Sequence, residues 1–196
     1  MLMWVCSKSR HEAAKTLCTQ ILAHLTRDRN NIFLLVFHVD GFLNVLIEAS
    51  ASDDVVRKQH AWWAIQNISY NKKCHKELGT MPKLLENLCK CCQVVEENYE
   101  TQIACMVTLR NLCQRLENVK QMFDTPSCTT TIFAFIWTRE LNKGRPELIY
   151  LASETLNAVC LLLNDSIEKN SPTDVTGSLD GAKLPSGKHR CWKPFA

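Results

Sequence analysis

The residues with the most potential for chemistry are the cysteines of the segment LCKCC, namely Cys89, Cys91 and Cys92. Cys74 and His75 lie upstream, and thiolates and imidazoles are the ligands that zinc prefers. Structural zinc, however, usually takes pairs of cysteines separated by about two to four residues, and a Cys-x-Cys-Cys run on a helix points its thiols in different directions. We predict that these cysteines are core and surface residues of one helix. A metal- or thiol-dependent activity of the cluster is the alternative.

The cysteine content as a whole indicates a reducing environment. The sequence has 11 cysteines in 196 residues, an odd number, and most of them fall inside apolar helical stretches. A free cysteine in such a stretch behaves as a small hydrophobic residue. The opening segment MLMWVC has no basic region before it and runs directly into SKSRHE, unlike a signal peptide. We therefore expect a cytoplasmic protein with free thiols.

No set of residues is arranged for catalysis. The sequence lacks the G-x-S-x-G, H-E-x-x-H and phosphate-loop motifs, so we expect neither an enzyme nor a bound cofactor. The net charge is only +3, and acidic residues interleave with the basic ones. Nucleic-acid-binding proteins usually carry a dense basic face, so we expect no nucleic-acid partner.

Basic residues flank one helical segment, either as a solvated face or as a docking surface for an acidic partner. These residues are Arg57, Lys58, Lys72, Lys73 and Lys76. The longest uninterrupted apolar run covers six residues, 32–37, whereas a membrane-spanning helix needs roughly 20. The sequence therefore predicts no membrane span.

The apolar pattern that positions these residues is helical. Prolines 82, 126 and 146 suit the first turn of a helix, and Gly144 suits the position after a helix end. From residue 165 onward the chain has three glycines, three prolines and few apolar residues, which predicts a helical domain over 1–164 and a disordered tail over 165–196. The predicted helices cover 11–26, a segment capped by Asp40, 53–70, 82–92, 100–116, 126–144 and 146–163.

Four helices repeat one pattern, in TQILAHL (19–25), WWAIQNI (62–68), MVTLRNL (106–112) and SETLNAV (153–159). Each has an apolar anchor, a second apolar residue three positions later and a small residue four positions earlier. Periods of about 40–47 residues are typical of armadillo and HEAT arrays, whose units stack to share a core. We therefore predict an all-α, right-handed solenoid of about four units. Its core anchors are Leu22, Ile65, Leu109 and Leu156, which follow one another at intervals of 43, 44 and 47 residues.

The stretch VVRKQHAWWAIQNISYNKKCHKELGTMPKLLENL (55–88) resembles one armadillo repeat, with an A-I-x-N-I core, a turn and a proline-led helix. The match recurs over 101–123, where no glycine follows. The glycine that usually precedes the next unit is displaced to Gly79, and His24 and Ala158 occupy the asparagine position of the outer units.

From about residue 40 to 164 the sequence is also similar to the C-terminal end of the rotatin family, large armadillo-like proteins of centrioles and ciliary basal bodies. AIQNISYN, MPKLL, LRNLC with NVKQMF, and LASETLNAVCLLLN carry this resemblance. It implies a non-enzymatic, protein-binding scaffold at the centrosome or ciliary basal body. Its partners would be centriolar or basal-body proteins.

Four residues are candidates for contact with a partner: Trp62, Trp63, Asn67 and Asn111. Adjacent helical tryptophans lie about 100° apart, so one can be buried while the other lies at an edge. An exposed tryptophan is a frequent binding hot spot, although packing between units is the simpler role. An asparagine near a helix end can bond the backbone of the next turn. A transport-type armadillo adaptor for basic peptides is a further alternative, which would also need an acidic groove.

Overall fold

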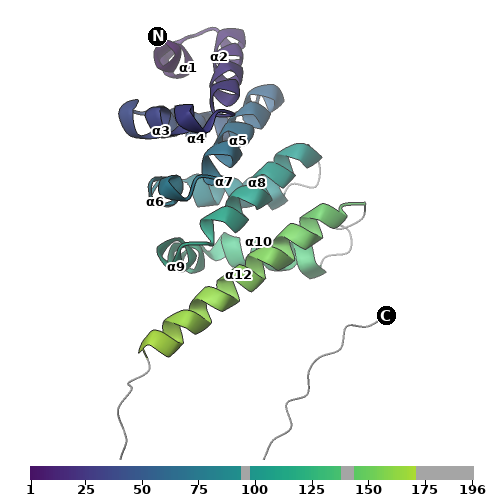
Figure 1. Cartoon of the computed structure of the whole chain (residues 1–196). Helices are drawn as coiled ribbons and strands as arrows, with labels where there is room; N and C mark the ends of the chain where they lie inside the picture. The colour runs from purple at the N-terminus through teal and green to yellow at the C-terminus, as the bar shows by residue number, and fades with distance from the viewer. Residues whose placement is uncertain (94–97, 138–143, 171–196) are drawn as a thin grey trace, which may run out of the picture.

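The structure, a computed structural model, describes residues 1–93, 98–137 and 144–170, and all regular elements in these ranges are helices. The predicted all-α class is thus confirmed. The helices follow one another in a stack that begins at the N-terminus and ends with α12 (Figure 1). They are α1 (Leu2–Lys8), α2 (Glu12–Leu25), α3 (Arg29–His38), α4 (Phe42–Ser50), α5 (Val55–Ser69), the 3-10 helix η1 (Lys72–Cys74), α6 (His75–Gly79), α7 (Leu84–Gln93), α8 (Tyr99–Leu112), α9 (Leu116–Asp124), α10 (Pro126–Trp137) and α12 (Pro146–Asn170).

After α1 and α2, the described chain repeats a group of three helices. The groups are α3-α4-α5, α6-α7-α8 and α9-α10-α12, and the last helix of each group packs on the helix before it in that group. The long helices α2, α5, α8 and α12 also pack on one another in succession, and Figure 1 shows them as a row. This packing places the four anchor-bearing segments of the sequence side by side.

Side-chain caps explain where several helices begin. Asp28, Asp54 and Asn98 each accept a hydrogen bond from the backbone N–H two residues later, at 2.9 Å. Such caps satisfy N–H groups that have no partner within the helix. The prediction that Asp40 caps α4 is wrong, because the capping position is Gly41, whose φ of 73° is a left-handed conformation that suits glycine.

Two other predicted boundaries need correction. Helix α7 begins at Leu84, so Pro82 lies in the preceding turn, where Lys83 has a φ of 65°. The single helix expected over 100–116 ends at Leu112, and α9 begins at Leu116. The end expected for the helix of Pro126, near Gly144, falls largely outside the described residues.

One hydrogen bond recurs at the corners between groups. At each corner, a polar side chain from the first helix of a group donates to a backbone carbonyl at the end of the preceding long helix, six residues earlier in the chain. We call this the corner bond. The three examples are Asn31 Nδ2 to Leu25 O at 3.2 Å, His75 Nε2 to Ser69 O at 2.7 Å, and Asn118 Nδ2 to Leu112 O at 3.2 Å. The carbonyls at a helix end lack partners within the helix, so this bond satisfies one of them each time.

Gly79 makes room for one corner bond. It lies within α6 and not in an open turn, and a Cβ atom built on it would lie 2.0 Å from Oδ1 of Asn118. Asn118 is buried, and its Nδ2 also donates to the backbone O of His75 at 3.0 Å. The displaced glycine of the sequence thus allows α6 and α9 to approach each other.

The last helix is longer than predicted. Helix α12 continues through residues 165–170 to Asn170, because no glycine or proline follows Pro146 until Pro172. The domain boundary expected at residue 164 therefore falls inside a helix, while 171–196 of the expected tail lie outside the described residues.

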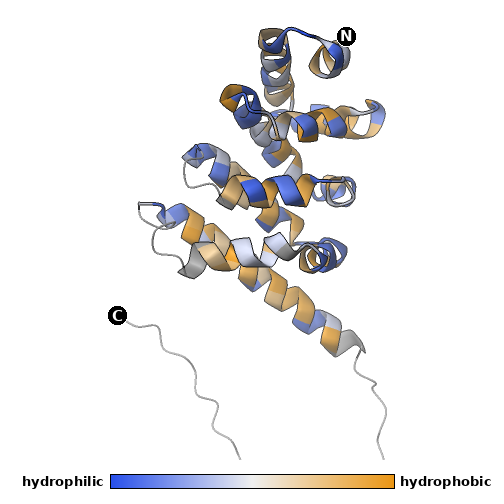
Figure 2. Ribbon diagram, turned by 180° about the vertical axis from the view of Figure 1, so that it is seen from behind, coloured by the Kyte–Doolittle hydropathy of each residue, from blue (hydrophilic) through white to orange (hydrophobic). Residues whose placement is uncertain are grey.

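By length and composition, helix α12 could also cross a membrane over Pro146–Ile167. Helices α3 (Arg29–His38) and α4 (Phe42–Ser50) are long and apolar enough to cross a membrane only when taken together, and the chain bends by 102° between them. The sequence predicts no span because its unbroken apolar runs are short. In α12 polar residues interrupt the apolar ones, but the mean hydropathy of the helix is still high, and Figure 2 shows it mostly in orange. One face of α12, with Leu148, Leu151 and Ala152, is buried where the helix packs on α8 and α10. Only 28% of the apolar window of α12 is buried in the structure.

Candidate protein-binding surface

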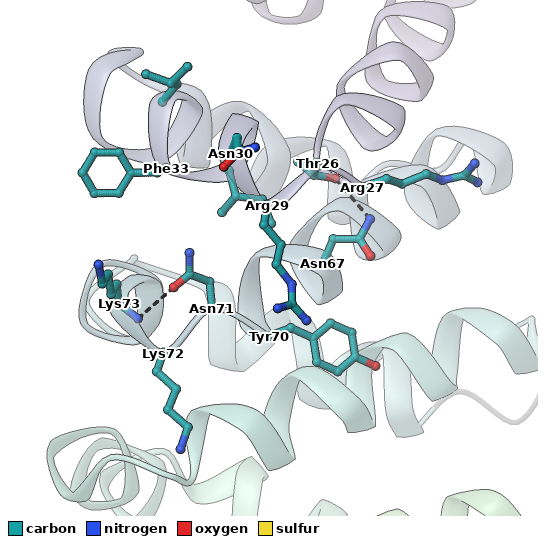
Figure 3. A pocket seen from close by; sticks show the side chains of 12 residues that line it. Thr26, Arg27, Arg29, Asn30, Phe33, Asn67, Tyr70, Asn71, Lys72 and Lys73 are labelled. Atoms are coloured by element: carbon teal, nitrogen blue, oxygen red, sulfur yellow. Dashed lines mark hydrogen bonds between the residues drawn. The ribbon is translucent and has the colours of Figure 1, made fainter.

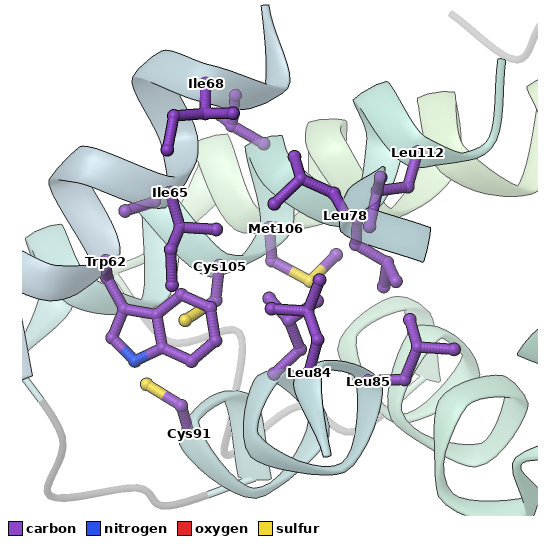
Figure 4. Close-up of a cluster of buried hydrophobic side chains, with 14 of the residues drawn as sticks. Trp62, Ile65, Ile68, Leu78, Leu84, Leu85, Cys91, Cys105, Met106 and Leu112 are labelled. Carbon is purple, nitrogen blue, oxygen red and sulfur yellow. The ribbon is translucent and has the colours of Figure 1, made fainter. Parts of the chain in front are cut away.

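The two adjacent tryptophans of α5 have different environments. Trp62 is 0% exposed, and Figure 4 shows it pointing into the core toward Cys91 and Cys105. Trp62 is therefore unavailable as a contact for a partner, and its role is packing between α5, α7 and α8. Its Nε1 has no hydrogen-bond partner among the described residues.

Trp63 is half-buried and packs against the edge of the same core, about 100° around α5 from Trp62. It lines a hollow of about 120 Å³ between α2 and α5, together with His24 and Arg27. The ring of His60 meets the Trp63 ring edge-on, with 5.1 Å between centroids. Burial, with the nearby charges of His24 and Arg27, lowers the pKa of His60, so its neutral ring packs against the indole. Of the two adjacent tryptophans, Trp63 is thus the one that a partner could reach.

The two candidate asparagines join successive long helices. Asn67 Nδ2 donates to Thr26 Oγ1 at 3.2 Å, which links α5 to the end of α2. Asn111 Nδ2 donates to Ser69 Oγ at 2.9 Å, which links α8 to α5. Asn111 is buried by this arrangement, so its role is structural and not direct contact with a partner. Asn67 is half-buried and still lines the surface.

The predicted repeat anchors lie along the row of long helices. Leu22, Ile65 and Leu109 are buried, and each belongs to a different long helix. Leu156 is only half-buried and lines an apolar hollow of about 100 Å³ between α9, α10 and α12. This hollow leaves Leu156 less covered than the other three anchors.

A hollow with a volume of about 660 Å³ lies where α2, α3, α5 and η1 meet (Figure 3). We call it the basic cleft, because it is lined by Arg27, Arg29, Lys72 and Lys73 and by no carboxylate among the described residues. Asn67 and Tyr70 form part of its wall. The sequence suggested Lys72 and Lys73 as a docking surface, but it paired them with Arg57, which is buried and bonds Glu12 at 3.4 Å.

Sequence reasoning missed Arg27 and Arg29 as part of this surface. Arg27 lies in the link between α2 and α3 and Arg29 is the first residue of α3, more than 40 positions before Lys72 and Lys73. The available clue is that both pairs follow a repeated segment. Arg27 and Arg29 lie five and seven residues after anchor Leu22, and Lys72 and Lys73 lie seven and eight residues after anchor Ile65. A cleft shared by two successive groups brings the two pairs together. Its charge does not favour the basic-peptide adaptor, which would need acidic residues near Asn67.

The cysteine cluster is a part of the core. Cys89, Cys91 and Cys92 are buried, and Cys89 Sγ lies 3.0 Å from Cys128 Sγ. The hydrogen bond with Cys128 lowers the pKa of Cys89, but Cys89 is buried, whereas a reactive thiol is accessible. No group of three or more His, Cys, Asp or Glu residues in the described ranges is placed to hold a metal ion. The described geometry therefore does not support a metal or thiol activity of the cluster.

Comparison with known proteins identifies a similar fold and no family. No protein-family model and no curated protein matches the sequence. Among solved structures, the chain is similar to an engineered protein whose crystal structure comes from the Northeast Structural Genomics Consortium. The TM-score is 0.61, with 17% sequence identity over 88% of this chain and 72% of the other. At this identity the likeness concerns the fold alone.

Proposed function

We propose that this chain is an armadillo-type, right-handed α-solenoid that acts as a non-enzymatic protein-binding scaffold. The corner bond is the observation that carries this proposal. It recurs at residues 31, 75 and 118, so its intervals of 44 and 43 residues reproduce the sequence period of the anchors. Repeat proteins of this kind contact mainly their neighbouring units and present extended surfaces, on which binding is the characteristic activity.

A binding role also agrees with what the surface offers. The basic cleft and the hollow of Trp63 lie next to each other, because Arg27 and Asn67 line both. A half-buried tryptophan beside charged groups is typical of interface hot spots, which are enriched in Trp and Arg. We propose this part of α2 and α5 as the centre of the partner surface.

The cellular place of the scaffold is a proposal from the sequence resemblance alone. Similarity to the rotatin family favours the centriole or ciliary basal body, with centriolar or basal-body proteins as partners. Proximity labelling of the full chain in ciliated cells, followed by pull-down with purified protein, tests this proposal. Enrichment of basal-body proteins is expected, and a chain that stays diffuse and captures none of them contradicts the location.

A tryptophan variant tests the binding surface itself. Trp63→Ala should weaken binding of a captured partner by about 2 kcal/mol if Trp63 is a hot spot. Trp4→Ala is the matched control, because Trp4 is exposed on α1 and away from this hollow. Equal effects of the two substitutions, or no effect of either, would show that the partner binds elsewhere.

A further inference from the structure

The basic cleft concentrates positive charge without internal compensation. Arg27, Arg29, Lys72 and Lys73 all line it, and none of them forms an ion pair with a described carboxylate. The nearest acidic residue in the sequence, Asp28, caps α3 through the backbone N–H of Asn30 and does not line the cleft. Like charges held together repel one another, and an anionic ligand would relieve that repulsion.

Helix stability explains only a part of this charge. Arg27 follows the end of α2, and Lys72 and Lys73 follow the end of α5, where the helix dipole favours cations. Arg29 is the first residue of α3 and so lies at the N-terminal end of that helix, where the helix dipole disfavours a cation. Its position therefore places charge in the cleft at a cost to the helix.

The next corner of the stack shows the neutralised form of the same arrangement. Arg115 lies in the link between α8 and α9, which corresponds to the link between α2 and α3 in the first group. Its Nε lies 3.0 Å from the carboxylate of Glu117. Charge compensation is thus available to this fold at such a corner, and the four cations of the basic cleft do not use it.

The other lining residues fit a peptide. Ile32, Phe33 and Leu34 supply an apolar wall, on which Phe33 and Leu34 are exposed. Asn30 and Asn71 add side-chain amides, which can bond the main chain of an extended segment. A volume of about 660 Å³ is of the size that holds a few side chains of a ligand.

Nucleic acid fits these observations less well. A nucleic-acid surface usually extends along a face and gives the domain a pI above about 9, whereas this chain has a net charge of +3 and a pI near 8.3. The positive charge is confined to one cleft, next to apolar side chains.

We propose that the basic cleft docks an acidic peptide segment of a partner protein, in which carboxylates alternate with apolar side chains. This inference rests on the proposed scaffold function and names the chemistry of its partner. The carboxylates would pair with cations from two successive groups, and the apolar side chains would cover Phe33 and Leu34. Binding would thus bridge the link after α2 and the link after α5.

Fluorescence anisotropy of the full chain tests the proposal with a defined probe, a labelled peptide of glutamates interrupted by leucines. Wild-type protein should bind it, and a glutamine analogue should bind at least about tenfold more weakly, since a cleft lined by four cations attracts the carboxylates collectively. Arg29→Glu with Lys73→Glu should weaken binding of the glutamate peptide by about tenfold or more. Arg29→Gln with Lys73→Gln should give a smaller loss in the same direction, and circular dichroism checks that each variant is folded.

The matched control is Lys90→Glu with Lys120→Glu, which makes the same change of net charge at exposed residues of α7 and α9 that do not line the cleft. Because charges farther apart than about 8 Å are screened at physiological salt, the control should change affinity by less than about twofold. Equal losses in cleft and control variants, no binding by wild type, or tighter binding of a single-stranded oligouridine would each overturn the proposal. A partner captured equally by wild type and cleft variants would leave the scaffold function intact and remove only this inference.

Discussion

Replacing Gly79 by alanine should destabilise the protein, although alanine is the better helix former. The new Cβ would lie 2.0 Å from Oδ1 and 2.7 Å from Cγ of Asn118, both far inside contact distance. Asn118 would have to leave its place. It would then lose the hydrogen bonds from its Nδ2 to the backbone O atoms of His75 and Leu112.

The size of the effect follows from three contributions. Two hydrogen bonds contribute roughly 0.5–1.5 kcal/mol each, and overpacking a well-filled site costs about 1–3 kcal/mol. The gain in helix propensity from glycine to alanine offsets about 1 kcal/mol. Gly79→Ala should therefore lower the free energy of unfolding by about 1–5 kcal/mol. In an Asn118→Ala background the contact is gone, so Gly79→Ala should be neutral or stabilising there.

Urea unfolding followed by circular dichroism measures all four proteins of this double-mutant cycle. We expect a coupling free energy of about 2 kcal/mol between positions 79 and 118, in the range found for residues in contact. Gly41→Ala is the matched control: Gly41 has a φ of 73° and nothing within 4 Å of its added Cβ, so its cost should not change with Asn118→Ala. A Gly79→Ala protein as stable as the wild type, or additive effects within about 0.5 kcal/mol, would refute the proposed contact.

Four further outcomes are expected. Leu109→Ala should cost roughly 2–5 kcal/mol in the same urea assay, and Leu156→Ala clearly less, because Leu109 is 1% exposed and Leu156 is half-buried; equal costs would contradict the assignment of the core. Burial lowers the pKa of His75, so the native state favours the neutral ring, and the free energy of unfolding should fall as the pH drops below about 6.5. The variant His75→Asn should flatten this pH dependence, because asparagine is the donor of the corner bond at residues 31 and 118 and does not titrate. In thiol labelling mapped by mass spectrometry at pH 8, exposed Cys160 should react well before Cys74 and Cys113, because burial raises the pKa of Cys74 to about 11 and that of Cys113 to about 12. Removing residues 171–196 should leave the thermal midpoint nearly unchanged, given their low apolar content, and a large drop would show that they pack on the helices.

The sequence contains enough information to find the long helices and most of their buried anchors, whereas the shorter helices α1, α3 and α6 are not predicted from it. Leu22, Ile65 and Leu109 follow from apolar spacing, because the side chains that face a neighbouring helix must recur once per group. It does not decide between Trp62 and Trp63, since adjacent positions differ only in which side of α5 is covered. That choice depends on where α7 and α8 lie.

The corner bond and the basic cleft are harder to predict. The donors of the corner bond are Asn31, His75 and Asn118, so the repeated feature is a hydrogen bond and no single residue type marks it. The cleft depends on two links of the chain that meet only after the long helices have packed. Gly79 shows the same difficulty: its role is set by Asn118, which belongs to another helix.

The corner bond also bears on how the molecule would respond to mechanical load. It joins residues only six positions apart, so tension between distant points of the chain does not act directly across it. The contacts between α5 and α8, and between α8 and α12, join distant parts of the chain and would carry the force first. Stretching should therefore separate one group of helices from the next while each corner stays closed, so that the stack yields as a series of stiff links.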